Sequence, residues 1–362
     1  QATEESSIVD VILESCASYE EAERQLPQHL KRYEGLFWKN EKVWVKPNML
    51  SARSPEEGVT THPTIVRGVL RFLLDLGVKP VVSDSPGVGN VRKVAVACGI
   101  SQVCQELAVP LIEMEEFVEK DGDVFKQLRL GDLIDRVDAV VNLPKLKTHG
   151  QMVLTMGVKN TFGCVLGLNK PAYHLRAKDY HLFADLLVDV HQLVKPVLTV
   201  MDGIDGMEGN GPSNGQKKRL GLLASCKNAY ALDHAVAMRL HVSPDKVYTL
   251  ARAKARGLIP EYKIHGNWRN SVKMPDTVGL TEIVKMPLWL QELTHHWARV
   301  PVFNTPKCIQ CKICERHCPA NAITVDKQHI DYKKCIRCYV CHELCPEDAL
   351  MLKRRLWKAG GR

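Results

Sequence analysis

Eight of the thirteen cysteines lie in the last 55 residues of the 362-residue chain, in two runs of identical spacing. The first run is Cys308-x2-Cys311-x2-Cys314-x3-Cys318 and the second is Cys335-x2-Cys338-x2-Cys341-x3-Cys345, each followed by a proline. Three closely spaced cysteines can wrap three corners of an iron–sulfur cube, but the fourth corner needs a thiolate from outside that loop. The repeat after 27 residues therefore predicts two equivalent halves that exchange one ligand.

This spacing resembles that of the bacterial two-cluster ferredoxins, in which the fourth cysteine of each run binds the cluster of the other run. Structural zinc sites instead use two separated pairs of ligands, and a disulfide framework would not be confined to a small part of a large chain. The resemblance implies two [4Fe–4S] clusters that carry single electrons. Their ligands would be Cys308, Cys311, Cys314 and Cys345 for one cluster, and Cys335, Cys338, Cys341 and Cys318 for the other.

The composition is that of a globular protein, with 45% hydrophobic residues. No apolar run reaches the length of about 18 residues that a membrane span needs, so we expect none. The polar, acidic start of the chain does not resemble a secretory signal, although the lack of an initial methionine leaves a removed leader open. The other five cysteines are scattered, and oxygen-sensitive clusters favour a reducing cytoplasm.

Apolar patterns alternate between strand and helix along the first 265 residues, which predicts an α/β fold with a mainly parallel, doubly wound sheet. A small α+β domain of the bacterial two-cluster ferredoxin type would follow it. We therefore divide the chain into an α/β body (1–265), a connector with one helix near 288–298 (266–305), the ferredoxin-like domain (306–352) and a basic tail (353–362). The strands are expected at 42–46, 79–84, 109–114, 137–143, 196–202 and 219–225, and the helices at 63–76, 91–107, 183–194, 229–240 and 246–256.

Positive charge is concentrated between residues 145 and 178, which hold six Lys or Arg and no Asp or Glu, within a net charge of +8. A charged stretch is most often a solvated face, and that explanation suits the basic tail. Apolar residues are interleaved with the lysines of 145–178, which favours a lined pocket for an anion.

Polar loops follow several expected strands, and in open α/β sheets ligands bind at the carboxyl ends of the strands. Lys145, Lys147 and His149 alternate, so they share one face if the strand continues through them. Such a trio could bind carboxylate or phosphate, and His149 could donate a proton. The candidate anion-binding residues are Lys46, Asn48, Asp84, Ser85, Lys145, Lys147, Lys159, Asn160, Asp202, Glu208 and Asn210.

Several of these residues also have simpler explanations, which we leave open. Asp84 and Asp202 could pair with the lysines or hold a cation, or they could cap the helices that follow. The glycines of 203–215 suit either a close backbone approach to a ligand or a flexible connection. Cys164 lies among lysines, which would lower the pKa of its thiol and make it a candidate catalytic group, although most such cysteines are buried and structural.

The segments 46–48, 60–63, 83–87, 142–149, 158–164 and 201–212 resemble the signature blocks of domain-of-unknown-function family 362. The resemblance covers roughly residues 40–260, and members of that family often carry a C-terminal two-cluster ferredoxin module. It implies an iron–sulfur protein with a redox role, and it implies no substrate.

These features favour a reductase, in which two clusters deliver electrons to an anionic small molecule in a basic pocket of the body. The alternative is an electron-transfer subunit that docks on a larger oxidoreductase and has no substrate of its own. Each hypothesis needs a soluble protein that donates or accepts electrons. The chain could form a homo-oligomer or belong to a larger redox complex, and we leave these alternatives open. Nucleic-acid binding is the weakest hypothesis, because only 6% of the residues are aromatic and no recognised binding module is present.

Overall fold

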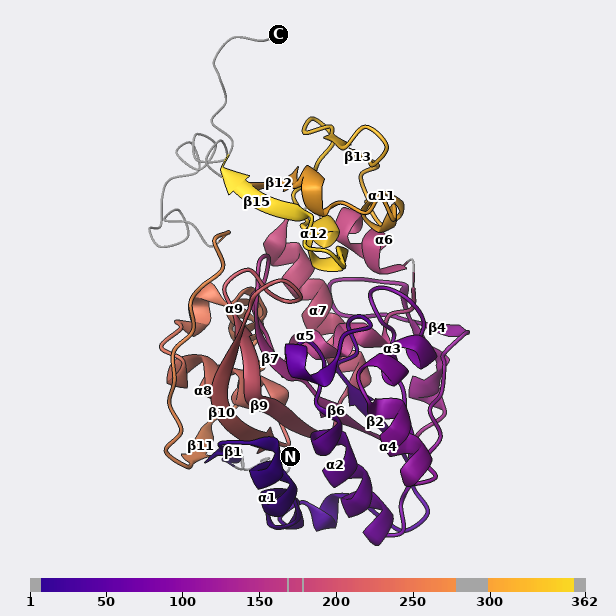
Figure 1. Ribbon diagram of the computed structural model, residues 1–362. Helices are drawn as coiled ribbons and strands as arrows, with labels where there is room; N and C mark the ends of the chain where they lie inside the picture. Colours follow the sequence, from indigo (N-terminus) through magenta and orange to yellow (C-terminus); the bar gives the residue numbers. More distant parts are fainter. Residues whose placement is uncertain (1–7, 168, 178, 278–298, 355–362) are drawn as a thin grey trace.

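Nine strands form one sheet, whose hydrogen-bonded order is β11-β1-β10-β9-β6-β2-β3, with β7 placed beside β9 and β8 beside β7. Figure 1 shows this sheet at the centre of the body, in a computed structural model that describes residues 8–167, 169–177, 179–277 and 299–354. Strands β9, β6, β2 and β3 are parallel to one another. This arrangement confirms the expected α/β class.

The strands of the body are β1 (Val9–Ser15), β2 (Lys42–Pro47), β3 (Lys79–Val82), β4 (Phe117–Lys120), β5 (Leu128–Gly131), β6 (Ala139–Leu143), β7 (Lys145–His149), β8 (Val153–Thr155), β9 (Leu198–Glu208), β10 (Gln216–Cys226) and β11 (Tyr262–His265). Its helices are α1 (Tyr19–Lys31), α2 (Pro63–Asp75), α3 (Val91–Ala97), α4 (Ile100–Glu106), α5 (Gly157–Asn160), α6 (Asn169–Arg176), α7 (Tyr180–Val194), α8 (Ala229–Arg239) and α9 (Tyr248–Ala255). Within the described ranges, no helix combines the length and the apolar composition needed to cross a membrane.

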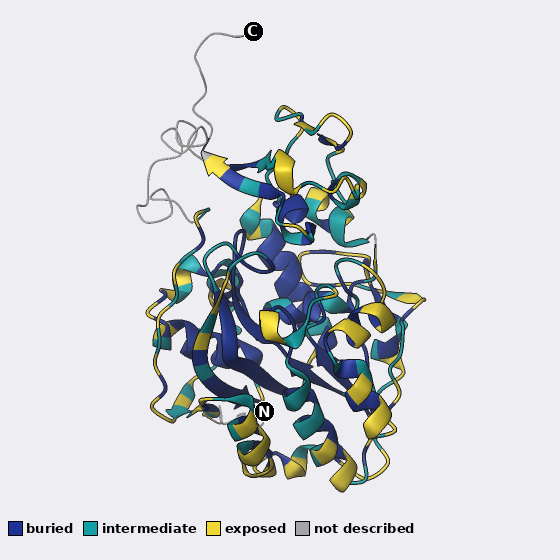
Figure 2. Cartoon of the chain, in the orientation of Figure 1, coloured by how far each residue is buried: buried dark blue, intermediate teal, exposed yellow. Residues whose placement is uncertain are grey.

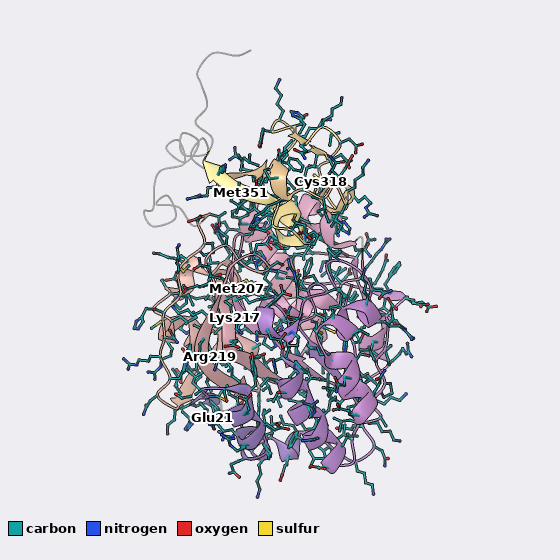
Figure 3. The ribbon with its side chains drawn as sticks, viewed as in Figure 1. Glu21, Met207, Lys217, Arg219, Cys318 and Met351 are labelled. Carbon is teal, nitrogen blue, oxygen red and sulfur yellow. The ribbon has the colours of Figure 1, made fainter. Side chains whose placement is uncertain are left out.

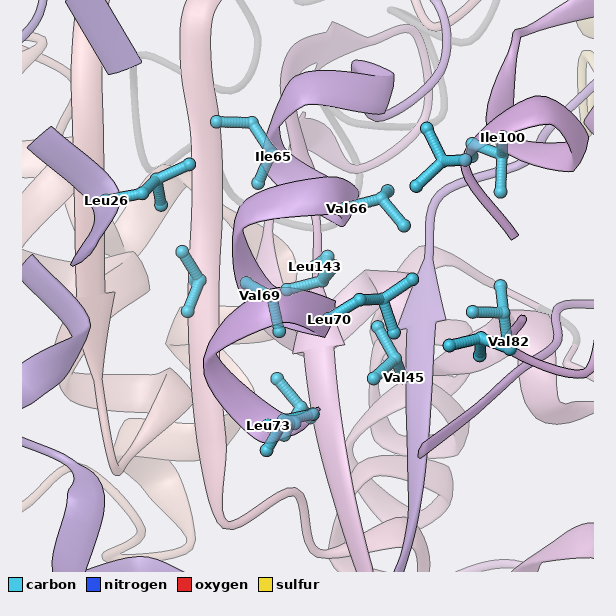
Figure 4. Close-up of a cluster of buried hydrophobic side chains, with 14 of the residues drawn as sticks. Leu26, Val45, Ile65, Val66, Val69, Leu70, Leu73, Val82, Ile100 and Leu143 are labelled. Atoms are coloured by element: carbon cyan, nitrogen blue, oxygen red, sulfur yellow. The ribbon is translucent and has the colours of Figure 1, made fainter. Parts of the chain in front are cut away.

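Helices cover both faces of the sheet because successive strand residues point to opposite sides. In β2, Val43 and Val45 pack into the core beneath α1 and α2, while Trp44 packs into the core on the α7 side. Figure 4 shows the first of these cores, where the apolar stripe of α2 lies on side chains of β2, β3 and β6. The outer faces of the helices remain exposed, and the strands between them are buried (Figure 2).

The sheet is mainly parallel, as expected, and β10 runs antiparallel to both β9 and β1. Two sequence predictions about the sheet need correction. The strand expected at 109–114 is reduced to a single bridge between Leu111 and Val82. The glycine-rich segment 203–215 is only partly a loop, since β9 continues to Glu208 and residues 209–215 connect it to β10 in a hairpin.

The ferredoxin-like domain is described from β12 (Arg299–Phe303) to β15 (Leu350–Arg354), with α11 (Ile313–Arg316), β13 (Ile323–Thr324), β14 (His329–Ile330) and α12 (Val340–Leu344) between them. Its two halves repeat in backbone conformation. Residues with positive φ occur in pairs 27 positions apart: Gln310 and Arg337, Lys312 and Tyr339, and Asn321 and Asp348. Left-handed backbone is rare outside glycine, so the repeated pattern shows that both cysteine runs fold in the same way.

Strand β12 lies in the segment predicted as a connector, and it pairs antiparallel with β15. The small domain is therefore closed by a strand that precedes the first cysteine run. The helix expected near 288–298 lies outside the described residues, as do Lys178 and most of the basic tail.

One buried carboxylate fixes the short helix α5 on the sheet, and its removal should destabilise the fold. Asp233 in α8 accepts hydrogen bonds from the backbone N–H groups of Gly157 (2.8 Å) and Val158 (2.9 Å). Asp233→Ala leaves both buried donors without an acceptor, which we expect to lower the free energy of unfolding by about 2 kcal/mol or more in chemical denaturation. The matched control is Asp245→Ala, since Asp245 makes only an exposed ion pair with Lys254, and its effect should stay below about 0.5 kcal/mol.

Candidate functional site

The eight cysteines of the two runs line two small cavities in the ferredoxin-like domain, each of about 20 Å³. Figure 3 places Cys318 in this domain, above the α/β body. One cavity is lined by Cys308, Cys311, Cys314 and Cys345, and the other by Cys318, Cys335, Cys338 and Cys341. Each run thus contributes three cysteines to one cavity and its fourth to the other.

The chemistry of these two cavities fits thiolate ligands of iron–sulfur cubes. In the described part of the chain, no three His, Cys, Asp or Glu side chains converge as the ligands of a single metal ion would. Each thiolate of a [4Fe–4S] cluster binds a different iron atom, so the four sulfur atoms need not lie around one point. The backbone N–H groups of Ala322 and Ala349 donate to Sγ of Cys318 (3.2 Å) and Cys345 (3.1 Å). Such hydrogen bonds to sulfur are one of the factors that set cluster potentials.

The ferredoxin-like domain lies on the body beside α6 and α7, at the end of the sheet where β7 projects (Figure 1). Polar contacts join the two parts. Arg53 donates to the carbonyl of Pro346 (2.9 Å), and Asn214 donates to that of His342 (2.7 Å). The body and the ferredoxin-like domain also pack closely at Gly87, where a Cβ would lie 3.0 Å from a side-chain carbon of Leu344.

A larger cavity of about 100 Å³ lies between the two parts. The carboxyl ends of β2 and β3, strands β7 and β8, and helices α5 and α6 supply its walls from the body. The ferredoxin-like domain supplies His317, Val340, Glu343 and Leu344. The cavity includes the candidate anion-binding residues Asn48, Asp84, Ser85, Lys147, Lys159 and Asn160.

Two of the candidate lysines are engaged in buried ion pairs at strand ends. Lys46 Nζ lies 2.8 Å from Asp84 Oδ1, and Lys145 Nζ lies 2.8 Å from Asp202 Oδ2. Asp84 also accepts from the backbone N–H of Met49. Of the alternatives considered for Asp84 and Asp202, the structure therefore shows pairing with lysines. Lys145 and Asp202 do not reach the cavity, because they form a separate buried cluster with Tyr19.

Lys147 is held by a chain of side-chain amides. Its ammonium donates to Asn48 Oδ1 (2.9 Å) and to the carbonyl of Val59 (2.7 Å). Asn48 donates in turn to Asn160, Asn160 to Asn142, and Asn142 to the carbonyl of Gly157. This chain ties three strand ends to α5 and fixes the wall of the cavity. Burial holds the pKa of Lys147 well below its usual range, and the charges of Lys159 and Lys145 act in the same direction.

Lys159 differs from the other lysines of the cavity. Among the described residues, no hydrogen bond or ion pair engages its ammonium group. Burial lowers its pKa, and the nearby carboxylate of Glu343 partly offsets this. The cavity also contains unpartnered polar atoms, namely Oγ1 of Thr155 and Nδ1 of His174. Burial and the charge of Lys159 lower the pKa of His174 to about 3, so its ring is neutral.

His149 is placed by the backbone next to the ferredoxin-like domain. Its Nδ1 accepts from the N–H groups of Gln151 (3.0 Å) and Met152 (3.1 Å), so the proton of the neutral ring lies on Nε2. That Nε2 lies 3.1 Å from Glu343 Oε1, although the geometry is not that of a good hydrogen bond. Burial holds the pKa of His149 well below its usual range.

The expectation of an activated thiol at Cys164 is wrong. Its side chain is fully buried, and burial raises its pKa to about 12, which outweighs the opposing effect of Lys46. Cys164 belongs to the hydrophobic core on the α7 side. A protonated, inaccessible thiol does not act as a nucleophile.

The remaining candidates lie in different surroundings. Ser85 lines the cavity, and its hydroxyl accepts from the N–H of Gly167 (3.3 Å). Glu208 pairs with Lys218 (2.9 Å), and Asn210 hydrogen-bonds Asp276 (3.0 Å), so neither side chain is directed to the cavity. Sequence reasoning missed Thr155, Lys170, His174 and Glu343. Lys170 stood within the basic stretch, but nothing local to the sequence associates Glu343, which lies between two cysteines, with lysines almost 200 residues earlier.

Two family models match separate parts of the chain. The family model of a domain of unknown function (DUF362) matches residues 43–238, and that of a 4Fe-4S dicluster domain matches residues 307–349. A thylakoid-associated protein of Synechocystis sp. is 35% identical over 260 residues, which cover 68% of this chain and 81% of that protein.

A solved structure with a similar chain path is the lactate racemase apoprotein of Thermoanaerobacterium thermosaccharolyticum. It is 12% identical, with a TM-score of 0.41, and the match covers 65% of this chain. The chain thus spans less than two thirds (57%) of that structure. A likeness at this level carries no argument about function.

A glycine allows the buried Lys46–Asp84 pair to form, and replacing it should be costly. A Cβ at Gly163 would lie 2.6 Å from Lys46 Nζ and closer still to Asp84 Oδ1. Gly163→Ala must displace a buried ion pair, so we expect a loss of about 1–3 kcal/mol in the free energy of unfolding. Gly35→Ala is the control, because its Cβ would meet no atom within 4 Å. Equal stability of the two variants would contradict this account of the pair.

Proposed function

Because the chain belongs to the family described as domain of unknown function (DUF362) and ends in a 4Fe-4S dicluster domain, we propose that it is an iron–sulfur reductase. Its substrate would be a small anion bound in the cavity between the two parts. One observation carries the proposal: the walls of that cavity come from both the body and the cysteine-bearing domain. A cluster bound in that domain would lie near a pocket that contains polar groups without partners, which supports the proposal.

Two [4Fe–4S] clusters would be held by the two groups of four cysteines that line the small cavities. Bound there, they supply single electrons. Reduction of one double bond requires two electrons and two protons, and two such centres hold one electron each. The electrons would come from a soluble donor protein, and water or ionisable groups of the cavity would provide the protons.

The side chains of the body would bind and orient the substrate. Lys159 is half-buried, and its ammonium group has no partner among the described residues, while Thr155 and His174 have buried polar atoms free for hydrogen bonds. His149 would act as a positioning residue, since its Nε2 faces Glu343 of α12. Asn48 and Asn160 would hold Lys147 at the wall. Burial of these groups excludes competing water and strengthens their interaction with a bound charge.

The second candidate function is that of an electron-transfer subunit that docks on a larger oxidoreductase. The observation in its favour is a pair of exposed isoleucines, Ile309 (62% exposed) and Ile336 (42% exposed). Each follows the first cysteine of its run and lines one of the two cysteine cavities. These residues would suit protein docking in either function. A cytoplasmic location stays a prediction from cluster chemistry, and the Synechocystis relative is named for its association with thylakoids.

The cofactor proposal predicts the metal content of two variants. The anaerobically purified chain should contain about eight iron atoms and eight sulfides, as two [4Fe–4S] clusters require. Cys341→Ala removes a proposed ligand, so iron should fall by about half or more. Cys164→Ala should retain the full content, because Cys164 belongs to the core of the body. Full iron content in Cys341→Ala, or extra iron lost with Cys164, would contradict the assignment.

Turnover by the isolated chain separates the two candidate functions. The reductase should oxidise a reduced, ferredoxin-type donor in the presence of a small unsaturated acid, with no other protein added. Lys159→Met should lower kcat/KM by about tenfold or more, because a charge-assisted hydrogen bond to the substrate is lost. If the clusters are oxidised only when an acceptor protein is added, the electron-transfer subunit is the correct assignment.

A further inference from the structure

Among the described residues, one lysine of the cavity between the two parts has an ammonium group that no hydrogen bond or ion pair engages. Lys46 is paired with Asp84, and the ammonium of Lys147 donates to Asn48 and Val59. Lys170 donates to the carbonyls of Ser85 and Pro86. Lys159 is the lysine of this cavity for which the described residues provide neither a hydrogen bond nor an ion pair. The side chain of Lys159 is half-buried and lines the cavity, so its ammonium group is open to an anion that enters there.

Neutral polar atoms lie in the same cavity as Lys159. Thr155 is 3% exposed, and its hydroxyl has no hydrogen-bond partner in the structure. Nδ1 of His174 is likewise buried and unpartnered. Two such atoms beside one ammonium group can satisfy the several lone pairs of a carboxylate.

Apolar side chains line the cavity together with its polar groups, which include the carboxyl group of Glu343. Phe162 and Leu50 from the body and Val340 and Leu344 from α12 line it together with prolines. The volume of about 100 Å³ is somewhat smaller than the engineered cavity of about 150 Å³ that accepts benzene. An apolar body of a few carbon atoms, up to one small ring, is the size that such a space accommodates.

We propose that this cavity binds a small monocarboxylate with a compact apolar body, whose carboxylate contacts Lys159 and whose body packs between Phe162 and Leu344. This inference deepens the proposed function, because it names the substrate class of the same site. A monoanion matches the one ammonium group of the cavity that no described residue engages. A phosphate ester or a nucleotide fits less well, since no described arginine lines the cavity and its other described lysines are already engaged.

The test compares acids with amides of the same shape. Acetate, crotonate and benzoate, and the corresponding amides, are titrated into the oxidised holoprotein under anaerobic conditions and followed by calorimetry. At least one acid should bind about tenfold or more tightly than its amide, because a charge-assisted hydrogen bond is lost in the amide. Inorganic phosphate is titrated in parallel and should bind more weakly than that acid.

Two variants test whether Lys159 binds the carboxylate of the ligand. Lys159→Met keeps the length of the side chain without its charge and should abolish the preference for the acid. Lys263→Met, at an exposed lysine of β11, should retain it. The proposal is overturned if no acid binds more tightly than its amide, if phosphate binds most tightly, or if Lys159→Met keeps the preference. The wild-type comparison decides the matter even if Lys159→Met fails to fold.

This binding test is independent of electron transfer. It uses the oxidised holoprotein and no electron donor, so acid binding without turnover would support the ligand class and remove the reductase. Turnover of a substrate other than a small acid would support the reductase and contradict the proposed ligand class.

Discussion

Burial of lysine charges at the ends of the parallel strands is the constraint on which this molecule depends. Lys46, Lys145 and Lys147 are almost completely removed from solvent, and a buried ammonium group must be paired or neutralised. Asp84 and Asp202 pair with the first two, and an amide chain holds the third. Lys159 is only half-buried and has no such partner among the described residues, which marks the cavity as a place for a ligand.

The sequence predicted the features that depend on local pattern. The period of the cysteines predicted two equivalent loops, which the repeated left-handed residues now show in the backbone. The apolar spacing of 63–76 predicted α2, and the hydrophobic runs predicted β2, β3 and β6 within a few residues. The rule that ligands bind at the carboxyl ends of strands selected Asn48, Asp84 and Lys147, which line one cavity in the structure.

The rest depended on tertiary contacts that no local pattern contains. Lys145 and Lys147 alternate in one strand, yet one pairs with Asp202 and the other with Asn48, because different strands face them. The thiol of Cys164 lies among lysines in the sequence but in an apolar core in space, which reverses the expected direction of its pKa shift. Glu343 reaches the cavity because the ferredoxin-like domain lies on the body, and that contact joins residues nearly 200 positions apart.

The central claim is that a small acid bound at Lys159 lies next to an iron–sulfur cluster. Electron–nuclear double resonance on the reduced holoprotein, saturated with benzoate or crotonate labelled with carbon-13 at the carboxyl group, tests this contact directly. The account predicts a coupling between the cluster spin and the labelled carbon that is absent in Lys159→Met. A holoprotein with full iron content that binds the labelled acid and shows no coupling would contradict it.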